Sequence, residues 1–186
     1  MKRFAMVLLV AVMVVVAALI RAAQPPSTGG QVVPSVIGQL TVLNTSTSLK
    51  VTGVAVTTTL TGQVEDVAPS ADDCFLVAQV DAVFVGKAFG NVDAAVTSGG
   101  KTFEPQGLMG VTLAEPGFTT HSTVPIVIPK NRLVGARLQF QTGAVIHGYQ
   151  RTVEVDLGLT ADRVAQLLES AGTPIAVDLP RTEVTP

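Results

Sequence analysis

Residues Phe75 to Val85, FLVAQVDAVFV, decide the fold class of this 186-residue chain. From Leu76 to Phe84, every second residue is apolar, whereas Gln79 and Asp81 stand in the other register. Alternation with period two over this length predicts a β-strand, because successive side chains of a strand point to opposite faces. Gln79 and Asp81 mark the face that we expect to meet solvent.

The same alternation recurs on both sides of this stretch. Further runs of Val, Thr and Leu lie at 40–44, 54–60, 91–96, 102–103, 124–128, 134–140 and 149–157. In the run at 40–44, Leu40 and Val42 share one face. Short strands with Gly, Pro and Asn turns between them, and no helical pattern among them, predict an all-β antiparallel sandwich.

Two turn signals support this assignment. The tetrapeptide Ser98-Gly99-Gly100-Lys101 has the composition of a hairpin turn, since glycine adopts positive φ without steric cost. Pro125 and Pro129 place their run at a sheet edge or at a strand end, because proline donates no ladder hydrogen bond.

A single helix is predicted after the strands. Thr160 is a suitable N-cap and Gly172 a suitable stop. One side of this helix carries four apolar residues at helical spacing: Val164, Leu167, Leu168 and Ala171. That face either closes an open end of the sandwich or docks a partner. A short strand is expected from Ile175 to Leu179, and a polar tail from Arg181 to Pro186.

The N-terminus carries the remaining apolar excess. Lys2 and Arg3 precede seventeen residues without a charge, from Phe4 to Ile20, and Arg21 follows them. This length is at the short end of the range for a membrane-spanning helix and exceeds a typical secretory h-region. No A-x-A site follows the run, so we expect an uncleaved signal anchor, with a cleaved signal peptide as the alternative.

The charges orient this anchor and limit its partners. Basic residues before the run predict a cytoplasmic N-terminus and an extracytoplasmic remainder at the cell membrane. All 14 acidic residues but only nine of the 12 basic residues lie beyond position 23, so that part carries about −5. No basic patch invites nucleic acid. The expected organisation is an anchor over 1–23, a Pro/Gly linker over 24–39, the sandwich over 40–158, and a helix, short strand and tail over 159–186.

Three stretches resemble a known family. They are FLVAQVDAVFV at 75–85, VDAAVTSGGKTFEP at 92–105 and STVPIVIPKNRLVGARLQF at 122–140. They are similar to the small Ig-like, telokin-like extracellular domains of unknown function in exported or anchored proteins of Gram-positive bacteria, especially actinobacteria. The resemblance covers about residues 48–158 and implies an Ig-like sandwich that serves as an exported binding or interaction module. It implies no catalytic residue.

The residues that carry chemistry are few. Asp72, Asp73 and Cys74 form the densest polar cluster, but they lack the spacing of a calcium loop. His121 and His147 are the only histidines, and neither has a second metal ligand at close spacing. Cys74 has no cysteine partner, so an internal disulfide is excluded. We therefore expect no metal and no cofactor.

Catalysis is also not expected. No G-x-S-x-G motif is present, and a chain without Trp and with one Tyr offers little aromatic surface for a sugar. The expected function is a non-catalytic, membrane-anchored interaction module or accessory subunit that binds another membrane or envelope protein. The alternative is a secreted Ig-like protein that binds a ligand or polymer after signal cleavage. Candidate partner contacts lie in the apolar loop at 107–118 and on the helix: Leu108, Met109, Phe118, Val164, Leu167 and Leu168.

Overall fold

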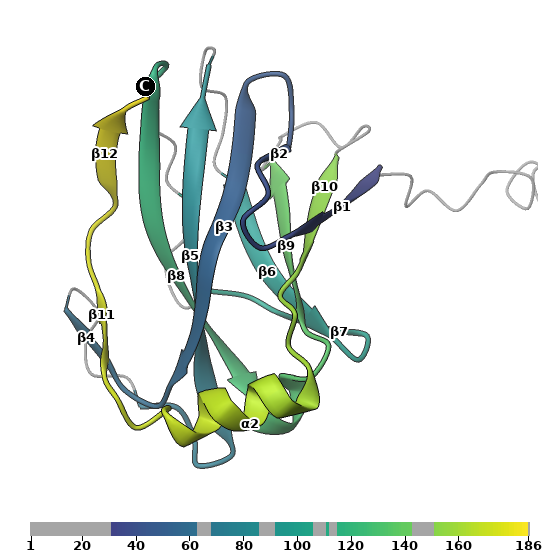
Figure 1. The fold of residues 1–186 in the computed structure, drawn as a ribbon, viewed down its shortest axis with the longest axis vertical. Helices are drawn as coiled ribbons and strands as arrows, with labels where there is room; N and C mark the ends of the chain where they lie inside the picture. The colour runs from purple at the N-terminus through teal and green to yellow at the C-terminus, as the bar shows by residue number, and fades with distance from the viewer. Residues whose placement is uncertain are drawn as a thin grey trace, which may run out of the picture. The chain divides into compact units, whose positions relative to one another are not determined.

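A computed structural model describes residues 31–62, 68–85, 92–105, 111, 115–142 and 151–185. The elements in chain order are β1 (Val32–Val36), β2 (Thr41–Val42), β3 (Thr47–Thr57), β4 (Leu60–Gly62), β5 (Asp73–Phe84), β6 (Val92–Ser98), β7 (Lys101–Phe103), β8 (Phe118–Pro129), a 3-10 turn η1 (Lys130–Arg132), β9 (Arg137–Thr142), β10 (Thr152–Asp156), α2 (Ala161–Glu169), β11 (Ile175–Val177) and β12 (Arg181–Val184). Figure 1 shows their arrangement.

Two five-stranded sheets pack face to face. Sheet A has the order β1-β10-β9-β6-β7, and sheet B has the order β12-β8-β5-β3-β2. The main core joins Leu76 and Val80 of sheet B to Leu138, Phe140 and Val153 of sheet A, all nearly inaccessible to solvent. The prediction of an all-β sandwich is therefore confirmed.

The stretch that predicted the fold class is the central strand of sheet B. β5 pairs along its length with β3 on one side and β8 on the other. Its even-numbered residues, from Leu76 to Phe84, are buried, whereas Gln79 is exposed. Pro129 ends β8, and Pro125 lies beyond the four β8 residues, Phe118 to His121, that pair with β12. Among the described strands, none pairs with Pro125 on the side of β8 that faces β12. Proline is tolerated there because it has no N–H to donate to a neighbouring strand.

The predicted turn and helix both form. Gly99 and Gly100 connect β6 to β7 with φ of 54° and 74°. Thr160 caps α2, and its hydroxyl accepts a hydrogen bond from the Arg163 N–H. Helix α2 lies across one end of the strands in Figure 1, and Val164 is buried in the main core.

The sequence predicts a purely antiparallel sandwich, but two pairs of strands are parallel. Strand β1 runs parallel to β10, from Val32 beside Thr152 to Val36 beside Asp156. Strand β11 runs parallel to β4. Parallel neighbours require long connections, and both of these pairs join segments that are far apart in the chain, which no local pattern reveals.

The expected boundaries also shift. Strand β1 lies inside the range 24–39 predicted as linker, because Val32, Val33 and Val36 are β-formers and Pro34 is acceptable in an edge strand. Strand β12 lies in the predicted polar tail and pairs with β8. The face shared by Leu40 and Val42 is exposed, whereas Thr41 and Leu43 are buried.

The predicted anchor at residues 4–20 lies outside the described residues. Among the residues that are described, no helix is long and apolar enough to cross a membrane.

Candidate functional site

The outer face of sheet B carries a second, smaller layer. Strands β4 and β11 form a two-stranded sheet over one end of this face. They bury Phe75 and Val77, which point away from the main core, against Leu60 and Val177. Phe75 and Val77 of β5 are apolar because this small cluster covers them, whereas Gln79 and Asp81, on the same side of the strand, lie beyond it and are polar.

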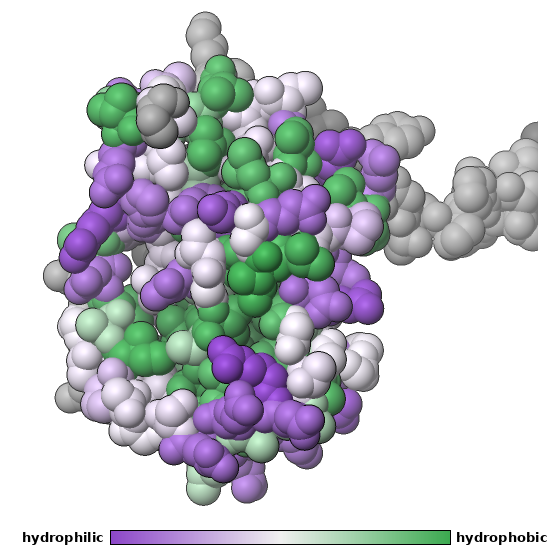
Figure 2. Space-filling view, viewed as in Figure 1, coloured by the Kyte–Doolittle hydropathy of each residue, from purple (hydrophilic) through white to green (hydrophobic). Residues whose placement is uncertain are grey.

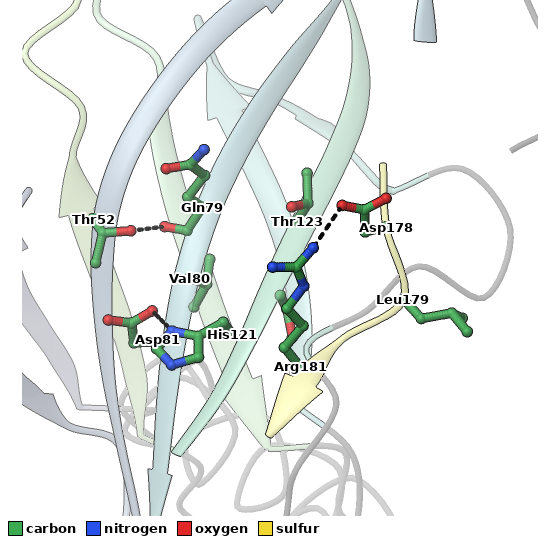
Figure 3. A pocket seen from close by; sticks show the side chains of 10 residues that line it. Thr52, Gln79, Val80, Asp81, His121, Thr123, Asp178, Leu179 and Arg181 are labelled. Carbon is green, nitrogen blue, oxygen red and sulfur yellow. Dashed lines mark hydrogen bonds and ion pairs between the residues drawn. The ribbon is translucent and has the colours of Figure 1, made fainter. Parts of the chain in front are cut away.

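Beyond this cluster the outer face is hollowed. A cavity of about 270 Å³ lies between β3, β5, β8 and the segment that joins β11 to β12. We call it the His121 groove. Its lining residues are Thr52, Gln79, Val80, Asp81, His121, Ser122, Thr123, Asp178, Leu179 and Arg181. Figure 3 shows polar side chains that meet there from several strands.

His121 is the central ionisable group of the groove. Its Nδ1 lies 2.6 Å from Asp81 Oδ1, and its Nε2 lies 3.7 Å from Glu183 Oε2. Asp81 belongs to β5, His121 to β8 and Glu183 to β12, and the register places Asp81 directly opposite His121. Asp81 and His121 point outward because they alternate with buried neighbours such as Val80 and Thr120. Glu183 lies on β12, where all four residues are exposed.

Two further contacts form the wall of the groove. Arg181 Nη2 lies 3.3 Å from Asp178 Oδ2, and both side chains are exposed. The Thr52 hydroxyl donates to the Gln79 carbonyl oxygen across β3 and β5, at 3.3 Å. The Gln79 side chain lies close over Gly53, where an added Cβ would come within 3.2 Å of Gln79 Oε1.

Carboxylates flank the His121 ring on both sides. Each ring nitrogen of His121 faces a carboxylate, and no hydroxyl or thiol is hydrogen-bonded to the ring among the described residues. A nucleophile-activating histidine needs one nitrogen within reach of the nucleophile. In the described part of the chain, no group of three His, Cys, Asp or Glu residues is arranged to hold a metal ion.

A second polar cluster lies on the outer face of sheet A. Arg137 Nη1 donates to Glu154 Oε1 at 2.5 Å, and Gln139 Nε2 donates to Glu154 Oε2 at 2.9 Å. The hydrogen bonds from Gln139 and Arg137 hold the pKa of Glu154 below its ordinary value. The same pairing raises the pKa of Arg137. This cluster lies on the opposite sheet from the His121 groove, so it serves here as a reference for the groove.

Where the structure describes them, the residues predicted as partner contacts lie in two places, on α2 and at the start of β8. Val164 is buried in the main core, and Leu167 and Leu168 pack against it while partly exposed. Phe118 is half-buried at the start of β8, where it pairs with Val184. Leu108 and Met109 lie outside the described residues. The helix face therefore covers the end of the sandwich, which was one of its two interpretations.

The residues that the sequence analysis considered as possible metal ligands do not form a common site where the structure describes them. Asp72 and Asp73 flank the start of β5, where Asp73 accepts a short hydrogen bond from the Ser70 hydroxyl. Cys74 is buried in the main core, and its thiol faces the Ile128 carbonyl oxygen at 3.5 Å. Burial raises the pKa of this thiol to about 11. His147 lies outside the described residues.

Sequence analysis did not single out the groove. The alternation around Gln79 and Asp81 marked an outward face, and the same period along β8 turns His121 and Thr123 outward. No local signal places Asp178, Arg181 and Glu183 beside them. Asp81 and His121 are 40 positions apart in the chain, and β12 pairs with a strand that lies far from it in sequence.

Comparisons with known proteins give a fold likeness and no family. The chain matches no protein-family model and no curated protein. Among solved structures it is similar to an uncharacterised β-sandwich protein from Clostridium difficile 630, with 9% sequence identity and a TM-score of 0.48. The likeness covers 72% of this chain and 99% of that one.

Proposed function

We propose that this protein is a non-catalytic, membrane-anchored module that binds another envelope protein at the outer face of the cell membrane. The observation that carries the proposal is the His121 groove, a solvent-open hollow in which charged side chains from several strands are held in fixed positions by one another. Groups held in place before binding lose little conformational entropy when a partner arrives.

The charges of the groove specify what the partner should present. Asp81, Asp178 and Glu183 supply three carboxylates around one guanidinium, that of Arg181. These three carboxylates outnumber the two basic side chains, Arg181 and His121, so the groove is net acidic. Charge complementarity favours a partner that inserts a Lys or Arg side chain.

The anchored location is supported by the sequence. The apolar run at 4–20 is long enough to span a bilayer, and basic residues precede it. The Ig-like, telokin-like resemblance is part of the same proposal, since such domains follow a signal or anchor. Mass spectrometry of the mature protein tests this part: a start at Ala22 to Gln24 would replace the anchored module with the secreted binding protein.

Co-purification from native membranes tests the groove. The full chain is extracted in detergent after cross-linking, alongside the triple variant Asp81→Asn, Asp178→Asn, Glu183→Gln, which removes the carboxylates of the groove, and the control Glu154→Gln. The control removes an ion pair from the opposite sheet. We expect one membrane protein to be captured by the wild type and by the control but not by the groove variant. A clean monomer, or equal capture by all three chains, contradicts the proposal.

A further inference from the structure

Exposed apolar side chains are concentrated in one short segment. Nine large hydrophobic residues are exposed among the described residues, and five of them lie between positions 32 and 42. We call these five the β1–β2 patch: Val32, Val36, Ile37, Leu40 and Val42. Their exposed fractions run from 36% to 56%. Scattered surface hydrophobics are ordinary, whereas a local cluster marks a contact surface.

The patch lies along one edge of the sandwich, on β1, on β2 and on the turn between them. The Ser35 and Thr41 hydroxyls lie 2.5 Å apart in a buried contact, which fastens β1 to β2. Because Ser35 and Thr41 point inward, their neighbours Val36, Leu40 and Val42 must point outward. Figure 2 shows hydrophobic side chains over the region where β1 and β2 lie in Figure 1.

The charge pattern suits a lipid surface. No charged residue occurs between Arg21 and Lys50, so the patch itself is free of charge. The Arg151 guanidinium borders it and donates to the Val42 carbonyl oxygen at 3.3 Å. Asp156 borders the other end, beside Val36. Glu154, which is paired with Arg137, lies beside Pro34 in the same register. The patch itself is thus uncharged and charges of both signs lie only at its border, as at surfaces that enter the headgroup region.

The chain length places the patch near the bilayer. Eleven residues separate Ile20, the end of the apolar run, from Val32. At about 3.3–3.6 Å per residue, such a segment reaches at most about 40 Å. If residues 4–20 cross the membrane, the patch is tethered within this distance of the lipid surface, and its effective concentration there is high.

The strand order makes such a contact compatible with partner binding. Strand β2 is one edge of sheet B, and β12, which borders the His121 groove, is the opposite edge. A sandwich that rests on its β1–β2 edge would therefore direct the groove away from the membrane. Pro34 in the centre of β1 disfavours pairing of this edge with a second copy.

We propose that the β1–β2 patch lies in the headgroup region of the membrane and holds the sandwich in one orientation, with the His121 groove facing outward. This inference rests on the membrane anchor of the proposed function. The occupant of the patch is the lipid surface rather than a protein.

Fluorescence quenching by spin-labelled lipid tests the proposal. The full chain, in a Cys74→Ala background, is reconstituted in vesicles of phosphatidylcholine and phosphatidylglycerol with a nitroxide on the lipid headgroup. A fluorophore is attached at Leu40→Cys, or at the control Leu179→Cys, which replaces an equally apolar side chain exposed to 65% beside the groove. We expect several-fold stronger quenching at position 40. Equal quenching at both positions overturns the proposal.

Two further measurements separate the ways in which the test can fail. Flotation with the vesicles reports the anchor: a chain that does not float contradicts the proposed function, whereas a chain that floats with position 40 unquenched contradicts only the patch. In the second measurement the nitroxide is attached to a second copy of the chain instead of to the lipid, so that quenching reports self-association. If the fluorophore at position 40 is quenched by the labelled copy but not by the labelled lipid, the lipid contact is overturned. The variant Val36→Ser, Val42→Ser changes exposed residues only, so it should keep the fold by circular dichroism and lose the quenching at position 40.

Discussion

At the scale of single residues, chemistry follows from where each side chain lies rather than from its type. Cys74 is the only thiol, yet it lies in the main core beside the Ile128 carbonyl. His121 is an ordinary residue of an alternating strand until Asp81 and Glu183 flank it. The same holds for Glu154, whose pKa is set by Gln139 and Arg137 on the neighbouring strand.

Cys74 makes stability fall at alkaline pH. Its thiol stays protonated in the folded chain up to a pKa of about 11, whereas the unfolded thiol ionises near 9.0. The unfolded state therefore loses its proton first, and the free energy of unfolding decreases as pH rises from about 9 to about 11. Chemical denaturation followed by far-UV circular dichroism checks this. Cys74→Ala should lack this component of the decrease, and an identical pH dependence in both chains would contradict the burial of the thiol.

Glu154 has the opposite dependence. Since its folded pKa is lowered, its stabilising contribution is present at neutral pH and is lost as pH falls below about 4.5 and through the folded pKa. Glu154→Gln should flatten this part of the acid limb, and Gln139→Leu should do so partially, because it leaves the Arg137 contact in place. Denaturation midpoints between neutral and acid pH measure both effects. A Glu154→Gln chain with an unchanged acid limb would show that the pair adds nothing.

At the scale of elements, the small sheet of β4 and β11 shapes the groove. It covers Phe75 and Val77, and the chain then leaves β11 through Asp178 and Leu179 to form the groove wall. The pairing of β4 with β11 depends on Gly62, which has φ of 101° and lies directly against β11. An added Cβ at Gly62 would come within 2.6 Å of the Val177 carbonyl oxygen.

Gly62→Ala should therefore disrupt this sheet. It adds both backbone strain and a clash with rigid backbone, whereas the control Gly100→Ala adds strain alone, since nothing lies within 4 Å of an added Cβ there. We expect the control to cost about 1–2 kcal/mol, and Gly62→Ala to cost more. Equilibrium unfolding in urea compares the two variants. Equal losses would mean that β11 moves aside without resistance.

At the scale of the whole molecule, one strand joins two cores. Leu76 points into the main core and Phe75 into the small cluster under β11, although they are neighbours on β5. Most of the strand pairing is between segments distant in sequence, such as β1 with β10 and β4 with β11. We expect such a chain to unfold as one cooperative unit.

The substitutions Phe75→Ala and Leu76→Ala should both lower one and the same unfolding transition. Truncations of this kind cost about 3–5 kcal/mol for Phe and about 2–5 kcal/mol for Leu. Differential scanning calorimetry of the two variants shows whether a single peak shifts in each. A main peak left in place by Phe75→Ala, with a separate small peak lost, would show that the outer layer unfolds independently.

Elements that depend on neighbouring residues follow from the sequence, whereas pairings between distant strands do not. The alternation in β5, the two glycines after Ser98 and the Thr160 cap are local signals, and each forms the predicted element. The Pro and Gly residues before β1 predict a linker there, and the polar composition of β12 predicts a tail. Both are edge strands whose only support is a partner strand from elsewhere in the chain.

The sequence by itself determined the sandwich class, the central strand and the capping helix, because period and capping act within a few neighbouring residues. It also sets the apolar run at 4–20 on which the anchor proposal rests. Only the tertiary structure decided the two parallel pairings, the exposure of Leu40 and Val42, and the meeting of Asp81, His121 and Glu183. Each of these depends on which distant segment supplies the neighbouring strand, and backbone hydrogen bonds between strands are the same whatever the side chains are.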